Sequence, residues 1–298
     1  MSQHQEHYSG VVAYYDTHPI NEEQIMRALT AQGVALATLT EEELKDHDQD
    51  HYGGLLANDV LAAKAGIRKE HHILDVCSGM GGPARYIAHR IGCRVTGLDL
   101  TESRYRGAIK LTEMVGLDEL VDFKHGNAQD MPFADDSFDV VIGQEAWCHV
   151  PDKPRLISEC ARVVKPGGVI AFTDILRTNK LSEGDMRRLR SEMTFPELET
   201  LRGYGQLLEK NGCTVVECDD LGEVWSRILE ERLAMYRSLQ SETERRFGTD
   251  RSREWDDAYS FFVSRYREDK LGGGRFIARR DRPPVSDDEQ EGMLSTCF

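Results

Sequence analysis

The sequence predicts an α/β fold in which helices cover both faces of a doubly wound, mostly parallel β-sheet. Short apolar, β-branched runs alternate with amphipathic helical stretches through the middle of the chain. A glycine-rich turn follows the first of these runs, and an acidic residue ends the second. Strands joined by helical crossovers lie parallel in one sheet, so ligands are expected at the carboxyl ends of the strands.

The predicted elements follow one another in a regular order. Apolar runs predict strands at 72–77, 93–99, 121–125, 138–143, 168–174, 213–218 and 276–278. Helical periodicity predicts helices at 83–91, 102–115, 153–164, 181–194 and 200–211, and a long helical segment at 221–270. Before the first strand, Asn21 and Thr40 precede acidic residues in the manner of helix N-caps. The glycine run 272–274 is expected to lead into the last strand.

A chain of 298 residues is long enough for one α/β domain with added cap elements. We expect an N-terminal helical cap at 1–65 and the α/β domain at 66–280, with helical additions near 176–199 and 221–270. The remaining residues, 281–298, contain two consecutive prolines and an acidic run, which predict a disordered tail.

Charge and cysteine content narrow the class of function. The chain has 37 Lys and Arg against 52 Asp and Glu, a formal net charge of −15. This balance disfavours a nucleic-acid partner and favours a small-molecule one. The seven cysteines lack the paired spacing of a zinc site, so we expect reduced thiols and no bound metal. The start of the chain is polar, and no apolar run approaches the ~20 residues of a membrane span, so we expect a cytoplasmic protein without a membrane partner.

The most informative segment is 73–83, which reads Ile-Leu-Asp-Val-Cys-Ser-Gly-Met-Gly-Gly-Pro. Gly79 and Gly81 lack a Cβ, so the turn can take positive φ and a ligand can approach the first amides of the next helix. Asp99 ends the second strand, where a carboxylate can accept hydrogen bonds from a ribose. The turn by itself suits any adenosine cofactor, including nicotinamide and flavin dinucleotides.

Taken together, four segments resemble class I S-adenosylmethionine-dependent methyltransferases. They are 74–81, 97–99, 127–133 and 156–168, in the order and at the separations of that family. The resemblance implies S-adenosylmethionine as the cofactor. It also implies a Rossmann-like sheet of seven strands whose last strand runs antiparallel to the others.

The resemblance assigns a role in cofactor binding to residues near the strand ends. Asp75, Ser78, Gly79 and Gly81 would surround the methionine part, and Asp99 would hold the ribose. Leu100 would lie against the adenine. Asn127-Ala128 stands where the family commonly has Asp-Ala, and an Asn oxygen can still accept from the adenine amino group. Gln144 would present its backbone to the cofactor. Asp99 could instead be a solvated acid, and Asn127 could instead cap a turn.

The acceptor side is expected after the fourth strand and in the N-terminal cap. His149 is the candidate for an acceptor contact or a general base, although it could equally make a structural hydrogen bond. Trp147 either walls the pocket or packs in the core. In related enzymes an N-terminal helix with a tyrosine closes over the cofactor, as Tyr15 would here, and His51-Tyr52-Gly53 resembles the segment that reaches the carboxylate end of the cofactor. Both tyrosines could instead serve in ordinary helix packing.

Within the family, the chain looks most similar to the sarcosine/dimethylglycine methyltransferases and other small-metabolite methyltransferases. We therefore expect methyl transfer to the nitrogen or sulfur of a small polar metabolite, such as dimethylglycine or methionine. The sequence is also compatible with C- or O-methylation of a specialised metabolite, and with a regulatory protein that only binds S-adenosylmethionine. An apolar stripe between Leu229 and Leu239 makes a homodimer plausible.

Overall fold

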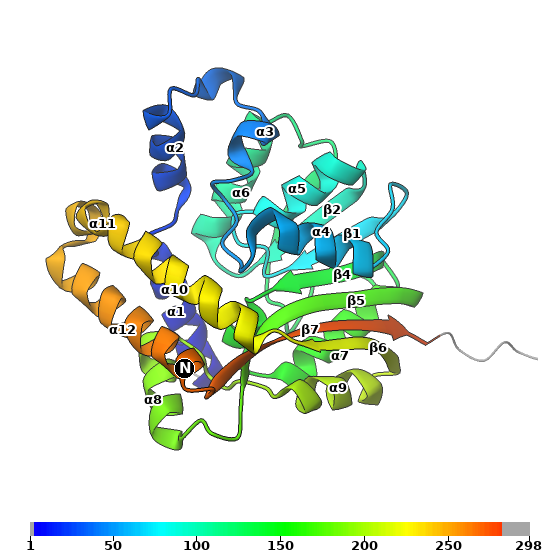
Figure 1. Cartoon of the computed structure of the whole chain (residues 1–298). Helices are drawn as coiled ribbons and strands as arrows, with labels where there is room; N and C mark the ends of the chain where they lie inside the picture. Colours follow the sequence, from blue (N-terminus) through cyan, green and yellow to red (C-terminus); the bar gives the residue numbers. More distant parts are fainter. Residues whose placement is uncertain (1–2, 282–298) are drawn as a thin grey trace, which may run out of the picture.

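The computed structural model describes residues 3–281 and contains one seven-stranded sheet flanked by helices (Figure 1). The strands are β1 (His72–Val76), β2 (Arg94–Asp99), β3 (Val121–His125), β4 (Phe138–Gln144), β5 (Val164–Arg177), β6 (Cys213–Asp220) and β7 (Leu271–Arg280). The helices before β1 are α1 (Gln3–Asp16), α2 (Glu22–Ala31), η1 (Leu36–Thr38), α3 (Glu41–Leu44) and α4 (Gly54–Lys64). The later helices are α5 (Gly82–Ile91), α6 (Glu102–Met114), η2 (Trp147–His149), α7 (Lys153–Val163), α8 (Glu183–Glu192), α9 (Leu201–Lys210), α10 (Gly222–Ser238), α11 (Gln240–Phe247) and α12 (Thr249–Arg267).

The strand order is β3-β2-β1-β4-β5-β7-β6. Strands β1 to β5 pair in parallel, whereas β7 inserts between β5 and β6 and is antiparallel to both. The predicted doubly wound, Rossmann-like sheet with an antiparallel last strand is therefore confirmed. The order reverses between β1 and β4, and such a switch point is where open α/β sheets bind ligands.

Alternating strand residues build a separate core on each face of the sheet. On one face, Leu74, Val141 and Phe172 join side chains of α7 and α9. On the other face, Ile73 and Val140 join side chains of α4, α5 and α6. Period-two alternation in strands that are buried on both sides explains why the sequence shows them as nearly continuous apolar runs.

Helices α1, α8, α10 and α12 gather at the end of the sheet where the parallel strands finish (Figure 1). A third core joins α8, α10 and α12, and Trp225 and Phe262 are buried in it. A fourth, smaller core joins α2, η1 and α3 to α6 through Leu111. The N-terminal and C-terminal additions thus cover the carboxyl ends of the parallel strands, where ligands are expected.

Three predicted boundaries are wrong. Strand β5 begins at Val164 rather than 168, so it includes the Lys-Pro-Gly-Gly segment at 165–168. Its pairing with β4 shifts register between Phe138 and Val140, which accommodates these extra residues. The glycine run 272–274 lies inside β7 and does not precede it. Glycine is required at 273 because a Cβ there would overlap the ring of Trp225. The segment 221–270 forms three helices, and the second break falls at Gly248, where φ is +88°.

The apolar stripe on which the homodimer was predicted is used within the chain. Leu229 is fully buried and Leu233 is 8% exposed, both in the core with α12. The stripe is therefore not an open face for a second copy. The predicted tail, 281–298, lies outside the described residues apart from Asp281. None of the helices in residues 3–281 combines the length and the apolar character needed to cross a membrane.

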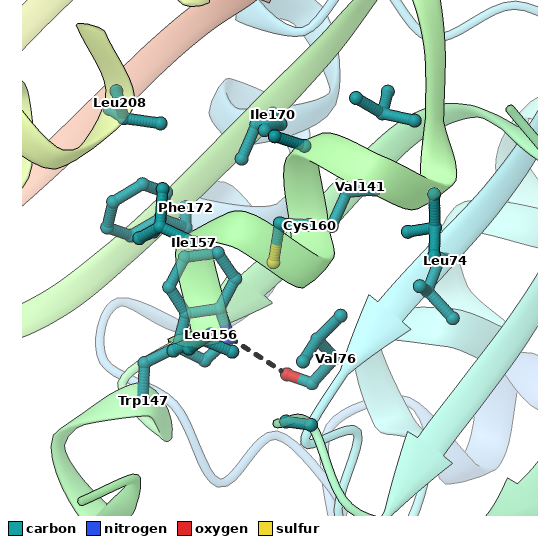
Figure 2. Close-up of a cluster of buried hydrophobic side chains, with 14 of the residues drawn as sticks. Leu74, Val76, Val141, Trp147, Leu156, Ile157, Cys160, Ile170, Phe172 and Leu208 are labelled. Carbon is teal, nitrogen blue, oxygen red and sulfur yellow. Dashed lines mark hydrogen bonds between the residues drawn. The ribbon is translucent and has the colours of Figure 1, made fainter. Parts of the chain in front are cut away.

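Trp147 offers a test of this packing. Its indole is completely buried, stacks on Phe172 with 4.2 Å between ring centroids, and donates from Nε1 to the Val76 carbonyl at 3.2 Å (Figure 2). Trp147→Ala should lower the free energy of unfolding by about 3–5 kcal/mol, since it leaves a large cavity. Trp147→Phe should cost less, because it removes the N–H donor but keeps a ring. Urea unfolding measures both, and a Trp147→Ala protein as stable as the wild type would contradict this packing.

Candidate functional site

A cavity opens at the carboxyl ends of the first four strands and encloses about 1090 Å³ of space free of protein atoms, its mouth included. Its walls come from the segments that follow β1, β2, β3 and β4, from α1, and from the segment between α3 and α4. Ten of the predicted site residues line it: Tyr15, Asp75, Ser78, Gly79, Asp99, Leu100, Asn127, Ala128, Gln144 and His149. The topology thus brings together residues that lie up to 134 positions apart, such as Tyr15 and His149.

The carboxylate of Asp99 joins two of the cavity walls. One oxygen accepts from the backbone N–H of Gly79 at 2.8 Å, and the other accepts from the N–H of Thr101 at 2.8 Å. Burial raises the pKa of Asp99, and these two hydrogen bonds act against the rise. Each carboxylate oxygen has a further lone pair, so the group can still accept from a vicinal diol in the cavity.

The turn after β1 presents polar groups to the cavity. Gly79 has φ +55°, and a Cβ built there meets no atom within 4 Å, so the turn is open on that side. Within residues 3–281, Asp75 Oδ2 and Ser78 Oγ are buried without a hydrogen-bond partner. Burial, and then the nearby Asp99, raise the pKa of Asp75 to about 7. Buried polar atoms of this kind are normally paired, which points to a polar ligand in the cavity.

The turns after β2 and β3 add apolar surface to the cavity. Leu100 after β2 and Ala128 after β3 line it, together with Asn127. The Asn127 Oδ1 accepts from the backbone N–H of Gln129 at 2.9 Å, so Asn127 does cap the turn. An amide oxygen has two lone pairs, and this cap therefore leaves one acceptor position for a ligand.

The segment after β4 adds two more polar side chains. Gln144 Nε2 lies 3.2 Å from His51 Nδ1, while its Oε1 is buried and has no partner in the described part of the chain. Glu145, with φ +47°, accepts from the backbone N–H of Tyr52 at 2.5 Å through Oε2. Its Oε1 is likewise buried and, among residues 3–281, unpartnered. Burial raises the pKa of Glu145 to about 7.

Tyr15 and His149 meet across the cavity. The Tyr15 hydroxyl lies 3.0 Å from His149 Nε2, and His149 Nδ1 lies 3.0 Å from Thr194 Oγ1 and 3.3 Å from the Thr194 carbonyl. Burial lowers the pKa of His149 to about 3, so the ring is neutral at pH 7. A proton on Nδ1 suits the carbonyl, and Nε2 then accepts from the tyrosine.

Three predicted site residues do not line the cavity. Trp147 packs against Phe172 in the core, which is the second of the two alternatives that the sequence left open for it, so it does not face the acceptor. The ring of Tyr52 packs against Trp225 at 5.0 Å between centroids, and only its backbone N–H reaches the site, through Glu145. Gly81 caps α5, where a Cβ would overlap the ring of Phe123. These three residues support the site instead of facing a ligand.

Two cavity residues, and one residue that contacts the cavity residue His149, were not assigned from the sequence. Glu145 adjoins the assigned Gln144, so its position directly after a strand was a usable signal. Arg104 lies one turn into α6 and also lines the cavity. Thr194 has φ +55° and contacts His149 from 45 positions away, and no local pattern in the sequence indicates that contact.

Comparison with known proteins agrees with this geometry. Residues 74–172 match the family model described as a methyltransferase domain. The chain is 33% identical over 174 residues to the glycine/sarcosine/dimethylglycine N-methyltransferase of Actinopolyspora halophila, covering 57% of this chain and 31% of the relative. It is 38% identical over 169 residues to the sterol 24-C-methyltransferase of Saccharomyces cerevisiae, covering 55% of this chain and 44% of the relative.

A solved structure shares the fold. Phosphoethanolamine N-methyltransferase 2 of Haemonchus contortus, in complex with phosphomonomethylethanolamine and S-adenosylhomocysteine, superposes with a TM-score of 0.71 at 20% identity. The match covers 88% of this chain and 58% of that one. The chain carries a methyltransferase domain of class I, the S-adenosylmethionine-dependent class. It spans between about a third and just over half of the length of the first curated relatives that it matches.

The raised pKa values predict how stability depends on pH. Asp75 and Glu145 have pKa values near 7 in the folded chain, against roughly 4 for unfolded carboxyls. Between these values the unfolded chain binds fewer protons than the folded one, so the free energy of unfolding should fall as pH rises from about 4 to about 7. Asp75→Asn and Glu145→Gln should therefore stabilise the ligand-free protein at pH 8 more than at pH 5.

Urea unfolding at both pH values measures this difference, and the exposed Glu209→Gln serves as a control that should change neither value. Equal effects of Asp75→Asn at pH 5 and pH 8 would show that Asp75 is not held protonated by its surroundings.

Proposed function

We propose that this protein is an enzyme that transfers a methyl group from S-adenosylmethionine to the nitrogen or sulfur of a small polar metabolite. The observation that carries the proposal is one cavity at the sheet switch point. It is lined by the doubly anchored Asp99 carboxylate, by four buried oxygens without partners in residues 3–281, and by the Tyr15–His149 pair.

The cavity residues fit this cofactor. The vicinal diol of a ribose matches the free lone pairs of Asp99. The ammonium group of the methionine part needs three acceptors, and the unpartnered oxygens of Asp75, Gln144 and Glu145 are of that kind. Leu100 and Ala128 offer apolar surface for the adenine. When bound, S-adenosylmethionine supplies an electrophilic methyl group on a sulfonium.

The protein's own contribution to such a transfer is alignment and exclusion of water. Tyr15 comes from α1, which forms part of the cavity wall, so one helix both encloses the cavity and places the Tyr15 hydroxyl in it. His149 accepts the Tyr15 proton in a hydrogen bond, which leaves the lone pairs of that hydroxyl oxygen free for a positively polarised group of the ligand, including an N–H where the acceptor has one. With a pKa of about 3, His149 is too weak a base to take a full proton at neutral pH. We therefore assign it the orientation of Tyr15.

Electrostatics support nitrogen or sulfur as the acceptor atom. Methylation of a neutral amine or a thioether produces a cation, whereas methylation of a hydroxyl does not. The cavity is lined by Asp75, Asp99 and Glu145, and a cation in it would favour the ionised forms of Asp75 and Glu145, whose pKa values are near 7. Asp48 and Asp50 from the cap also line it, each paired with an arginine. Carboxylates in a poorly solvated site stabilise a cationic product. An amino-acid-like amine such as dimethylglycine and a thioether such as methionine both meet this condition.

C-methylation is the second candidate function. The 38% identity with a sterol 24-C-methyltransferase favours it, and Glu145 would also stabilise a carbocation. O-methylation, and a regulatory role limited to cofactor binding, would each use the same donor site, so product analysis is what separates them from N- or S-methylation.

We also propose the division of labour along the chain. Residues 1–65 serve as a cap, because they contribute Tyr15, Asp48, Asp50 and other side chains to the cavity wall. Residues 66–280 serve as the methyltransferase domain. The additions near 176–199 and 221–270 support the acceptor side, since Thr194 holds His149.

Donor binding is the first test. Isothermal titration should show that S-adenosylmethionine and S-adenosylhomocysteine bind the wild type, and that Asp99→Ala weakens both at least about 30-fold, as two charge-assisted hydrogen bonds are lost. The exposed Asp118→Ala is the matched control and should bind like the wild type. Unchanged affinity in Asp99→Ala would rule out the ribose assignment.

Acceptor identity is the second test. The wild type is incubated with methyl-labelled donor and a panel of amines, thioethers, phenols and alkenes, and the products are identified by mass spectrometry. Label in an amine or thioether supports the proposal, and label on carbon or oxygen contradicts it in favour of C- or O-methylation. Donor binding without label in any compound would favour a regulatory role.

The Tyr15 hydroxyl should matter for turnover and not for donor affinity. Tyr15→Phe removes the group that faces the acceptor but keeps the ring, so kcat should fall about 10- to 100-fold while the Kd of S-adenosylhomocysteine changes less than about threefold. Single-turnover kinetics and titration measure the two quantities. A kcat equal to that of the wild type would exclude Tyr15 from acceptor alignment.

A further inference from the structure

Arg104 is a cation inside the cavity to which the proposed reaction assigns no role. It lies on α6, three residues after the N-cap residue Thr101, and is 5% exposed. Among the described residues that line the cavity, Arg104 is the single lysine or arginine. The two histidines of the lining, His51 and His149, have pKa values lowered by burial to about 4 and about 3, so both are neutral at pH 7.

The guanidinium of Arg104 makes few protein contacts. Its Nη2 donates one long hydrogen bond, 3.4 Å, to the Tyr15 carbonyl, and its Cζ stands 5.1 Å from the centroid of the Tyr15 ring. Within residues 3–281, no carboxylate oxygen lies within 4.0 Å of it, and its remaining N–H groups have no hydrogen-bond partner. Four of its five N–H donors are thus available to a ligand.

Two other arginines near the cavity, the buried Arg85 and the half-buried Arg232, show the usual arrangement. Arg85 donates to the Asp48 carboxylate at 2.6 Å, and Arg232 donates to the Asp50 carboxylate at 2.9 Å. Both of these arginines have an anionic partner within the protein. In the described chain the Arg104 nitrogens are not buried without a partner, so the guanidinium faces the cavity, with Asp99 and Asp50 near enough to interact with its charge but not ion-paired to it. An anion or ordered water in the cavity can complete its hydrogen bonds.

We propose that Arg104 binds the carboxylate of a ligand in this cavity. The inference rests on the proposed function, and it gives a binding role to a cavity residue that otherwise has none. The cavity acids, Asp75, Asp99 and Glu145, suit the cationic groups and the ribose of a ligand, whereas Arg104 is the complementary group for an anion. The planar fork of the guanidinium matches the two oxygens of a carboxylate.

Two ligands can supply that carboxylate. One is the donor, whose amino-acid part ends in a carboxylate. The other is an acceptor that carries an acidic group together with its amine or thioether. Arg104 lies over the ring of Tyr15 and lines the same cavity as Asp99 and His149, so either source is within the same site.

The donor arm of the test compares S-adenosylhomocysteine with its decarboxylated analogue, which keeps the amine and lacks the carboxylate. Both are titrated into the wild type, Arg104→Gln and Arg104→Lys. If Arg104 holds the donor, Arg104→Gln should weaken S-adenosylhomocysteine at least about tenfold and leave the decarboxylated analogue unchanged. Arg104→Lys should give an intermediate loss, because it keeps the charge without the fork.

The acceptor arm uses protein saturated with S-adenosylhomocysteine. Dimethylglycine and methionine are titrated against their carboxamides, in the wild type and in Arg104→Gln. If Arg104 holds the acceptor, the wild type should prefer at least one acid over its amide, and Arg104→Gln should remove that preference. Arg106→Gln is the matched control in both arms, because Arg106 is on the same helix but exposed and paired with Glu102. Circular dichroism and thermal melting check that each variant is folded.

The outcomes separate the two proposals. If the wild type binds no S-adenosylhomocysteine, the proposed function fails, and this inference fails with it. If the wild type binds it, but Arg104→Gln changes acids and their uncharged counterparts equally in both arms, the role of Arg104 as a carboxylate site is overturned while the proposed function stands. A loss confined to carboxylate ligands in either arm supports the inference and identifies the source.

Discussion

The site depends on one carboxylate, that of Asp99. Its two oxygens hold the N–H of Gly79 on the turn after β1 and the N–H of Thr101 at the start of α6. It thereby fixes the distance between two adjacent strand ends at which a nucleoside would bind. Because β1 pairs with both β2 and β4, the same turn is also in register with the polar segment that follows β4. The acid is therefore a structural tie, and we propose that it is a ligand acceptor as well.

The additions to the sheet are organised around the same cavity. Arg232 on α10 donates to the backbone carbonyls of Asp50 and His51 and to the Asp50 carboxylate. The next residue, Tyr52, donates its backbone N–H to Glu145 after β4. A continuous series of hydrogen bonds thus runs from the C-terminal helices, through the N-terminal cap, to the end of β4. This explains physically why the segment 221–270 belongs to the fold of the site although it contributes no lining residue among those described.

The sequence predicted the features that depend on local patterns. Strand and helix alternation gave the parallel sheet, and the glycine turn with Asp99 located the cavity. The ends of strands were harder to predict where the neighbouring elements were unknown. The predicted β7 was too short, because local composition does not reveal the close approach of Trp225 to Gly273. Trp147 was ambiguous for the same reason, since only the tertiary fold decides whether an aromatic ring after β4 faces the cavity or Phe172.

Long-range polar contacts were the least predictable part of the site. Thr194 orients His149 from a loop with φ +55°, and threonine in that conformation has no sequence signature. Arg104 looks like any charged residue in the first turn of a helix until the fold places it in the cavity. Its charge acts on Asp99 and Asp50 there, but no carboxylate oxygen of the described chain forms an ion pair with it. In contrast, the positive φ of Gly79 was predictable, because glycine is the residue that a turn open to a ligand requires.

The central claim is that the sugar of S-adenosylmethionine binds at the carboxyl ends of β1 and β2. A crystal structure of the protein grown with S-adenosylhomocysteine tests it most directly. We predict both ribose hydroxyls within hydrogen-bonding distance of the Asp99 carboxylate, with the thioether facing Tyr15. Density for the nucleoside elsewhere on the chain, or a ribose that leaves Asp99 uncontacted, would contradict it.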